Sequence, residues 1–138
     1  LTATKNSLKN HLGSATTVNA TWSYHHAGRG LHKGSGDERL LNGMIKAERT
    51  ATTNTPATVS LTGISYPTYD ILIYVGWVYP SGIGVVQQGM DPATNRYFRA
   101  SSAPPFFGWK EITSNVLVTP TIGNYVHYRN LTGSSQTI

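Results

Sequence analysis

Carboxylate side chains are the residues of this sequence that could carry acid–base chemistry, and the chain has six of them. A glycoside hydrolase usually holds two carboxyl groups about 5 to 10 Å apart, with the pKa of one raised by its surroundings. Asp91 lies in an Asp-Pro turn, and Asp37 and Glu38 resemble the acidic first turn of a helix. Glu111 lies in an alternating segment, as an exposed strand residue would. These residues have structural explanations, so we predict that the protein is not an enzyme.

Histidines gather in the segment WSYHHAGRGLHKGSGDE, where His25, His26 and His32 precede Asp37. Imidazole nitrogens beside a carboxylate bind Zn²⁺ or Cu²⁺ in many proteins. The spacing here matches no metal signature, and adjacent histidines in a strand point to opposite faces. Ca²⁺ held by Asp37 and backbone carbonyls is an alternative that the residues leave open. We expect solvated loop histidines and no metal site.

Other cofactor chemistry finds no support in the chain. The sequence contains no cysteine, so it has no thiolate nucleophile or thiolate metal ligand. Gly82-Ile83-Gly84 precedes a strand-like segment rather than a helix, which is the wrong context for a dinucleotide-binding loop. No serine nucleophile elbow occurs. We therefore predict no cofactor.

Aromatic residues near strand ends and turns are the strongest candidates for ligand binding. Trp77 and Tyr79 end an apolar run, and Phe106, Phe107 and Trp109 follow a Pro-Pro turn. Aromatic rings stack on the C–H faces of sugars and also anchor protein interfaces. We predict these five as the ligand-binding residues.

Two Asn-x-Thr triplets match the acceptor sequence for N-glycosylation. They begin at Asn19 and Asn130. Asn19 lies on the polar face of an expected strand, whereas Asn130 lies in an expected turn, where a glycan is tolerated. Chance occurrence in a Thr-rich chain is the alternative explanation. We take both as candidate glycosylation sites and expect Asn130 to be the better acceptor.

The charge pattern argues against a nucleic-acid partner. The formal net charge is +5, from 11 basic and 6 acidic residues. Basic patches bind nucleic acids by releasing counterions from phosphates. Here the basic residues are scattered, without a run or a known nucleic-acid motif. No apolar run approaches the roughly 20 residues that span a bilayer, so we also expect no membrane insertion.

Glycine, proline and other turn formers divide the chain into short alternating segments. The expected strands lie within residues 17–23, 58–61, 69–82, 84–88, 96–99, 109–113, 115–118, 123–128 and 135–138. We predict an all-β fold, an antiparallel two-sheet sandwich of jelly-roll type with eight or nine strands. Residues 35–43 fit one short helical turn, with an irregular loop as the alternative. No boundary divides the chain, so we expect a single domain over residues 1–138.

The run YDILIYVGWVYPSG, residues 69–82, is apolar on both alternating faces. Strands buried on both sides have this pattern, so we predict a central strand. We assign Tyr74 and, in the strand at 17–23, Trp22 to the core. Asp70, the one acid of the run, is expected to bond to backbone near the start of the strand.

Three segments carry a resemblance: SGDERLLNG (35–43), VSLTGISYPTYDILIYVG (59–76) and GNYVHYRNLTGSSQTI (123–138). In this order they resemble a poorly characterised β-sandwich module of very large secreted bacterial proteins. The resemblance covers about two thirds of the chain and implies an extracellular, galactose-binding-like or jelly-roll sandwich beside carbohydrate-active or adhesive domains. It transfers no functional residue. Met44 replaces the usual aromatic residue, residues 82–108 differ, and the usual closing strand is missing after Ile138.

Two hypotheses about function follow from these observations. The first is a noncatalytic extracellular module that acts in assembly or adhesion, as a subunit of a fibre, sheath or surface layer through edge-strand contacts. Its partners would be like subunits or neighbouring modules of the same protein. The alternative is a carbohydrate-binding module that holds extracellular glycans on its aromatic residues. Because the chain begins with Leu1 rather than Met, we expect a processed or excised segment.

Overall fold

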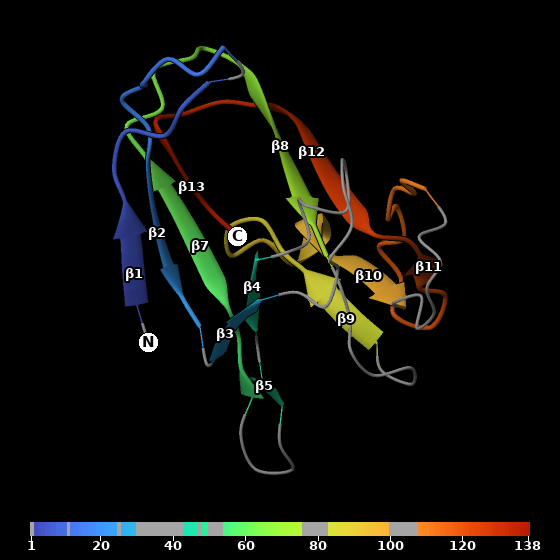
Figure 1. Ribbon diagram of the computed structural model, residues 1–138. Helices are drawn as coiled ribbons and strands as arrows, with labels where there is room; N and C mark the ends of the chain where they lie inside the picture. Colours follow the sequence, from blue (N-terminus) through green and yellow to red (C-terminus); the bar gives the residue numbers. More distant parts are fainter. Residues whose placement is uncertain are drawn as a thin grey trace. The chain divides into compact units, whose positions relative to one another are not determined.

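The computed structural model describes residues 2–10, 12–24, 26–29, 43–46, 48–49, 54–75, 83–99 and 108–138. Within these ranges the regular structure consists of β-strands and one short 3₁₀ turn, η2 (Pro92–Thr94), which confirms the all-β prediction (Figure 1). The strands form two compact units, one of the strands within residues 2–62 and 135–137 and the other of the strands within residues 69–131. The jelly-roll arrangement and the single-domain organisation stay predictions.

A four-stranded antiparallel sheet is the main element of the first unit. Its strand order is β1 (Thr2–Lys5), β2 (Asn19–Ser23), β7 (Thr58–Thr62) and β13 (Ser135–Thr137) (Figure 1). Strand partners therefore come from both ends and the middle of the sequence. β1 and β13 are the outer strands of this sheet.

The two faces of this sheet differ in chemistry because the side chains alternate along each strand. One face carries a row of hydroxyl residues that crosses all four strands: Thr4, Thr21, Ser60 and Thr137. Within it, the Thr4 and Thr21 hydroxyl oxygens lie 3.2 Å apart and those of Ser60 and Thr137 3.3 Å apart. The opposite face carries mainly apolar residues, including the buried Ala20. The alternation predicted for residues 17–23 is thus present, although Trp22 is only half-buried.

Two short hairpins complete the first unit. β3 (His26–Arg29) pairs with β4 (Gly43–Lys46), and β5 (Glu48–Arg49) pairs with β6 (Asn54–Thr55). His26 therefore lies in a strand, so the predicted loop is wrong at this position. His25, His32 and residues 35–42 of the expected helical turn lie outside the described residues.

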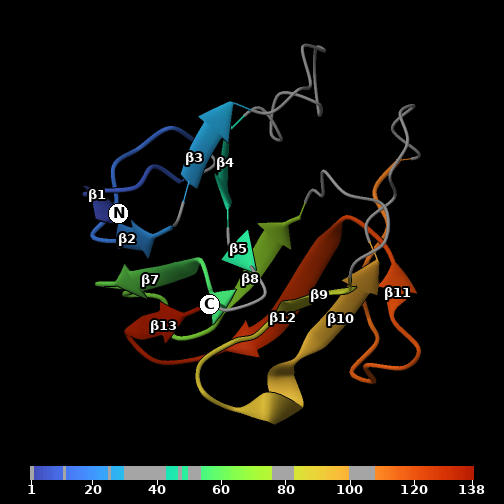
Figure 2. The ribbon, with the colours of Figure 1, turned by 90° about the horizontal axis from the view of Figure 1, so that it is seen from below.

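The second unit contains two further sheets. β8 (Tyr69–Tyr74) pairs antiparallel with β12 (Tyr125–Leu131). The second sheet has the order β11 (Thr121–Ile122), β10 (Arg96–Arg99) and β9 (Ile83–Val86) (Figure 2). β9 and β10 are antiparallel, whereas β10 and β11 are parallel.

The core of the second unit gathers around the inner face of β12. Ile112 and Val126 are 1% and 0% exposed, and Tyr128 and Phe98 are also buried. The Tyr128 hydroxyl donates toward two carbonyl oxygens, of Val86 at 3.0 Å and Thr94 at 2.9 Å. This shared donation satisfies the only polar atom of a buried ring and ties β12 to the end of β9 and to η2.

Several strand predictions are close to the observed bounds. β10 matches residues 96–99, and β2, β7, β9, β12 and β13 overlap their expected segments. Residues 109–113 and 115–118 were expected as strands, but they contain only an isolated bridge at Glu111, so these two predictions are wrong. Residues 76–82 of the expected central strand lie outside the described part of the chain.

The prediction that β8 is a central strand is wrong for the described residues. β8 has one strand neighbour there, β12. Leu72 is 48% exposed and Tyr74 is 41% exposed. One face of β8 therefore reaches solvent in spite of its apolar residues, and Tyr74 is not a core residue.

Candidate functional site

The solvent-facing side of the β8–β12 pair is the candidate functional site. Burial alternates along β8, so that Asp70, Leu72 and Tyr74 point outward. On β12, Val126 and Tyr128 are buried, which places the alternating residues between them on the other side. We call the following set the outer face: Asp70, Leu72, Tyr74, Trp109, Glu111, Tyr125, His127 and Arg129.

Residues 108–112 extend the outer face beyond β12. The Ile112 backbone N–H donates to the Tyr125 carbonyl at 2.7 Å, and the Asn124 N–H donates to the Lys110 carbonyl at 2.9 Å. The Asn124 side chain adds two bonds, accepting from Lys110 N at 2.8 Å and donating to the Gly108 carbonyl at 2.8 Å. With Ile112 turned into the core, its odd-numbered neighbours Trp109 and Glu111 face the same side as Tyr125.

Three aromatic rings meet at one end of the outer face. The ring centroids of Tyr74 and Trp109 lie 4.8 Å apart with the planes tilted by 57°. Tyr125 lies 6.5 Å from Tyr74 and 6.4 Å from Trp109, edge-on to the latter. Such distances and tilts are typical of favourable aromatic contacts. The rings therefore support one another, while Tyr74 keeps 41% of its surface exposed.

Among the predicted ligand-binding residues, Trp109 belongs to this aromatic cluster. The other four, Trp77, Tyr79, Phe106 and Phe107, lie outside the described residues. Tyr74 and Tyr125 were not among these five residues. A signal for Tyr74 was present, because it lies four residues after Asp70 and hence on the same side of a strand as a charged residue.

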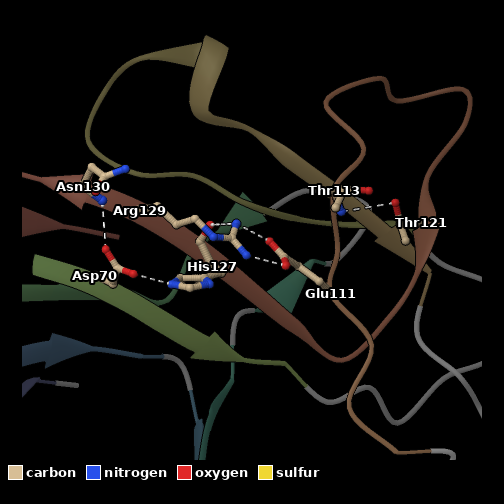
Figure 3. A network of polar contacts seen from close by, with 7 residues as sticks. All are labelled: Asp70, Glu111, Thr113, Thr121, His127, Arg129 and Asn130. Atoms are coloured by element: carbon tan, nitrogen blue, oxygen red, sulfur yellow. Dashed lines mark hydrogen bonds and ion pairs between the residues drawn. The ribbon is translucent and has the colours of Figure 1, made fainter.

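A hydrogen-bonded pair links β8 to β12 at the other end of the outer face. Asp70 Oδ2 lies 2.8 Å from His127 Nε2, and Asp70 Oδ1 accepts the Asn130 backbone N–H at 2.9 Å (Figure 3). The bond to Asn130 first, and then the one to His127, lowers the pKa of Asp70. The expectation that Asp70 bonds to backbone near the start of its strand is thus confirmed.

An ion pair lies next to it. Arg129 donates from both terminal nitrogens to Glu111, at 2.6 and 2.7 Å, in the two-pronged geometry that suits a guanidinium and a carboxylate (Figure 3). These bonds lower the pKa of Glu111 and raise that of Arg129. Arg129 also donates to the His127 carbonyl at 3.4 Å. Glu111 is therefore an ion-paired residue rather than a merely exposed one.

The outer face contains two carboxyl groups, those of Asp70 and Glu111, and both accept hydrogen bonds. Both of its carboxyl groups have lowered pKa values, so neither is prepared to act as a general acid near neutral pH. In the described part of the chain no three His, Cys, Asp or Glu side chains are grouped as a metal site. His127 was not recognised in the sequence, because only the pairing of β8 with β12 brings it to Asp70.

The two candidate glycosylation residues differ in their surroundings. The Asn19 side chain accepts from Ser7 N at 3.0 Å and donates to the Thr17 carbonyl at 3.3 Å, and the residue is half-buried. Asn130 is exposed and has a φ of 55° at an irregularity of β12, so it lies within a strand rather than in a plain turn. The expected preference for Asn130 stays a prediction, and the exposure of its side chain agrees with it.

No protein-family model, curated protein or solved structure matches the chain. The likeness to secreted bacterial β-sandwich modules therefore stays a prediction. Within the described ranges, the chain has no helix with the length and apolar character needed to cross a membrane.

Proposed function

We propose that this protein is a noncatalytic extracellular adhesion module that binds glycans through the outer face of β8 and β12. The observation that carries the proposal is the placement of an aromatic cluster, in which the Tyr74 ring is exposed, beside the Asp70–His127 and Glu111–Arg129 pairs on one sheet surface. The aromatic cluster consists of Tyr74, Trp109 and Tyr125.

Sugars present both C–H faces and hydroxyl groups, and the outer face offers a counterpart to each. Aromatic rings are large and rigid, so they provide apolar contact area at a small loss of conformational entropy. Tyr74 and Leu72 are 41% and 48% exposed, so this end of the surface is accessible. A few fixed polar groups beside such a surface orient a ligand and give specificity.

The Glu111–Arg129 and Asp70–His127 pairs are held in place before any ligand arrives. Arg129 is fixed by Glu111, and His127 by Asp70. Fixed groups lose little entropy on binding. The guanidinium has five N–H donors, and the bonds to Glu111 and His127 use three of them. Arg129 therefore retains donors for ligand hydroxyls.

The noncatalytic part of the proposal is supported by the protonation behaviour of the Asp70 and Glu111 carboxyl groups. Cleavage of a glycosidic bond needs a carboxyl group that stays protonated near working pH. Asp70 and Glu111 are both shifted the other way by their partners. The bonds that hold these carboxylates thus favour recognition of a sugar over hydrolysis.

An extracellular location is part of the proposal and is supported by composition. Only 12% of the residues are charged, and Thr, Ser, Gly and Asn make up much of the polar remainder. The likeness to secreted modules points the same way. Neighbouring modules of a longer protein would be the natural partners of such a domain.

Retention on immobilised polysaccharides tests the proposal. The probes are cellulose, chitin, xylan, laminarin and pectin, and we expect retention on at least one of them. Trp109→Ala and Tyr74→Ala should each weaken that retention by about tenfold or more, because central aromatic contacts dominate binding energy. Tyr66→Ala is the matched control, since Tyr66 is 47% exposed but lies outside the outer face.

Far-UV circular dichroism of each variant separates loss of binding from loss of folding. Equal retention of the Trp109→Ala, Tyr74→Ala and Tyr66→Ala proteins would refute the assignment of the outer face. Release of reducing sugar from a retained polysaccharide would refute the noncatalytic part of the proposal.

A further inference from the structure

We propose that the four-stranded sheet of the first unit extends from one molecule to the next, with β13 of one copy pairing antiparallel with β1 of a second copy. This assembly surface is separate from the glycan-binding function and does not depend on it. In the described residues β1 and β13 are the two edges of that sheet. Unpaired edges are ready templates for strand addition.

Strand direction fits this addition. All three pairings in the sheet are antiparallel, so β1 and β13 run in opposite directions. A second copy in the same orientation therefore brings its β1 antiparallel to β13 of the first. Repeated addition of this kind uses two different edges and generates an open chain of molecules rather than a closed pair.

The backbone bonds of β13 show which of its groups face the open edge. Val59 and Ile138 exchange two backbone bonds, both of 2.8 Å, so they form a hydrogen-bonded pair. Opposed residues in an antiparallel ladder alternate between bonded and non-bonded pairs. The next pair, Ser60 and Thr137, is therefore non-bonded. The N–H and C=O of Thr137, and by the same alternation those of Ser135, point away from β7.

The same alternation fixes the outward groups of β1. Since Ser60 directs its N–H and C=O away from β13, it forms a bonded pair with Thr21 of β2. Thr21 then forms a non-bonded pair with Thr4. The backbone groups of Thr4 and Thr2 thus point out of the sheet at the opposite edge. In the described part of the chain, both edges therefore direct backbone donors and acceptors out of the sheet at hydroxyl-bearing residues.

One register joins these groups within the observed strand bounds. Ser135 lies opposite Thr4 of the second copy and Thr137 opposite its Thr2, which gives four backbone hydrogen bonds. Gln136 then lies opposite Ala3, in a non-bonded pair on the other face. Hydroxyl residues meet hydroxyl residues, so the alternation of the two faces continues across the junction.

Neither edge carries the usual protection within the joined residues. Charged residues and proline are the common means of blocking an edge strand. Residues 2–4 and 135–137 read TAT and SQT and contain neither. The one charged residue of β1, Lys5, lies outside the proposed register.

Engineered cysteines test the direction of the contact, and the chain has no native cysteine to interfere. The pair Ala3 and Gln136 is suitable, because Cα atoms of a non-bonded pair lie about 4.5 Å apart, within the range of a disulfide. An equal mixture of the Ala3→Cys and Gln136→Cys proteins should form a mixed disulfide dimer, whereas each protein alone should not. Ser65→Cys, at an exposed residue outside both edges, replaces Gln136→Cys as the control for random collision.

Homodimers of equal yield in the separate samples would overturn the proposal in favour of a symmetric contact of like edges. No cross-linking above that of the Ser65→Cys control would overturn it altogether. Both results leave glycan retention unaffected, so failure of this inference is distinguishable from failure of the proposed function.

A proline at the edge gives an independent measurement. Thr137→Pro removes an N–H that points to the open edge and leaves the bonds between β13 and β7 intact. Sedimentation velocity measures the protein concentration at which assembly begins. For Thr137→Pro this concentration should be about tenfold or more higher than for Thr137→Val, which keeps the N–H. Identical onsets for the two variants, or a starting protein that is monomeric throughout, would overturn the proposal.

Discussion

The Tyr128 hydroxyl offers the sharpest test of how the outer face is held in place. Tyr128 is 5% exposed, and its hydroxyl donates toward the carbonyls of Val86 and Thr94. Tyr128→Phe keeps the ring, and with it the contact to Arg96, whose guanidinium carbon lies 5.8 Å from the ring centroid. The substitution therefore removes a buried hydrogen bond and little else.

The expected loss of stability follows from this geometry. A buried hydrogen bond contributes about 1 kcal/mol, and a buried carbonyl that loses its donor costs roughly 1 to 3 kcal/mol. We expect a decrease in the free energy of unfolding of about 2 kcal/mol, or roughly 6 °C in the melting temperature of a chain of this size. Urea unfolding followed by circular dichroism measures it. Tyr66→Phe, at a residue 47% exposed, is the control and should change the free energy by less than about 0.5 kcal/mol.

The same variant has a signature at high pH. Burial raises the pKa of Tyr128 from 10.0 to about 12. A group whose folded pKa is raised stabilises the fold below its unfolded pKa, and this stabilisation is lost as the pH rises toward the folded value. Stability of the unaltered protein should therefore fall more between pH 10 and 12 than that of Tyr128→Phe. Equal stability of the Tyr128→Phe and Tyr66→Phe proteins at neutral pH would refute the reasoning.

Two further predictions concern the outer face and its support. The pKa values of Asp70 and Glu111 are lowered from 3.8 and 4.5, so their bonds stabilise the fold above these values and are lost as the pH falls below them. Urea unfolding at pH 6 and pH 3 measures this loss. Between the two pH values, the free energy of unfolding should decrease less for Glu111→Gln than for the unaltered protein. Gly123→Ala would place a Cβ 2.7 Å from Ile112 Cγ1 and 2.8 Å from the Lys110 carbonyl oxygen, so the free energy of unfolding should decrease by about 1 to 3 kcal/mol. Gly89→Ala is the control for backbone strain alone, because its Cβ would meet no atom within 4 Å although φ is +64°.

Local alternation accounts for the part of the fold that was predictable. The segments at β2 and β7 alternate between polar and apolar residues, and this pattern is a property of each segment alone. The strands β3 to β6 have two to four residues and are defined by their pairing, so their sequences hold little signal. β8 was misjudged for a related reason. Its residues are apolar on both faces, but coverage depends on neighbours that the segment does not encode.

Two residues of the candidate site were recognisable in the sequence, but their arrangement was not. Trp109 was recognised as a binding residue because it follows a Pro-Pro turn, and Asp70 as a residue that bonds to backbone. Asp70 and His127 are 57 residues apart, and only the register of β8 with β12 brings them together. Register is a long-range property, and a shift of one residue would turn His127 into the core.

NMR titration with oligosaccharides cut from the retained polysaccharide tests the central claim most directly. Glycan binding at the outer face predicts that the largest amide shifts occur at Leu72, Tyr74, Trp109, Tyr125 and His127, and that Tyr66 shifts little. Saturating binding with the largest shifts at residues of the four-stranded sheet, and none at these five, would contradict it.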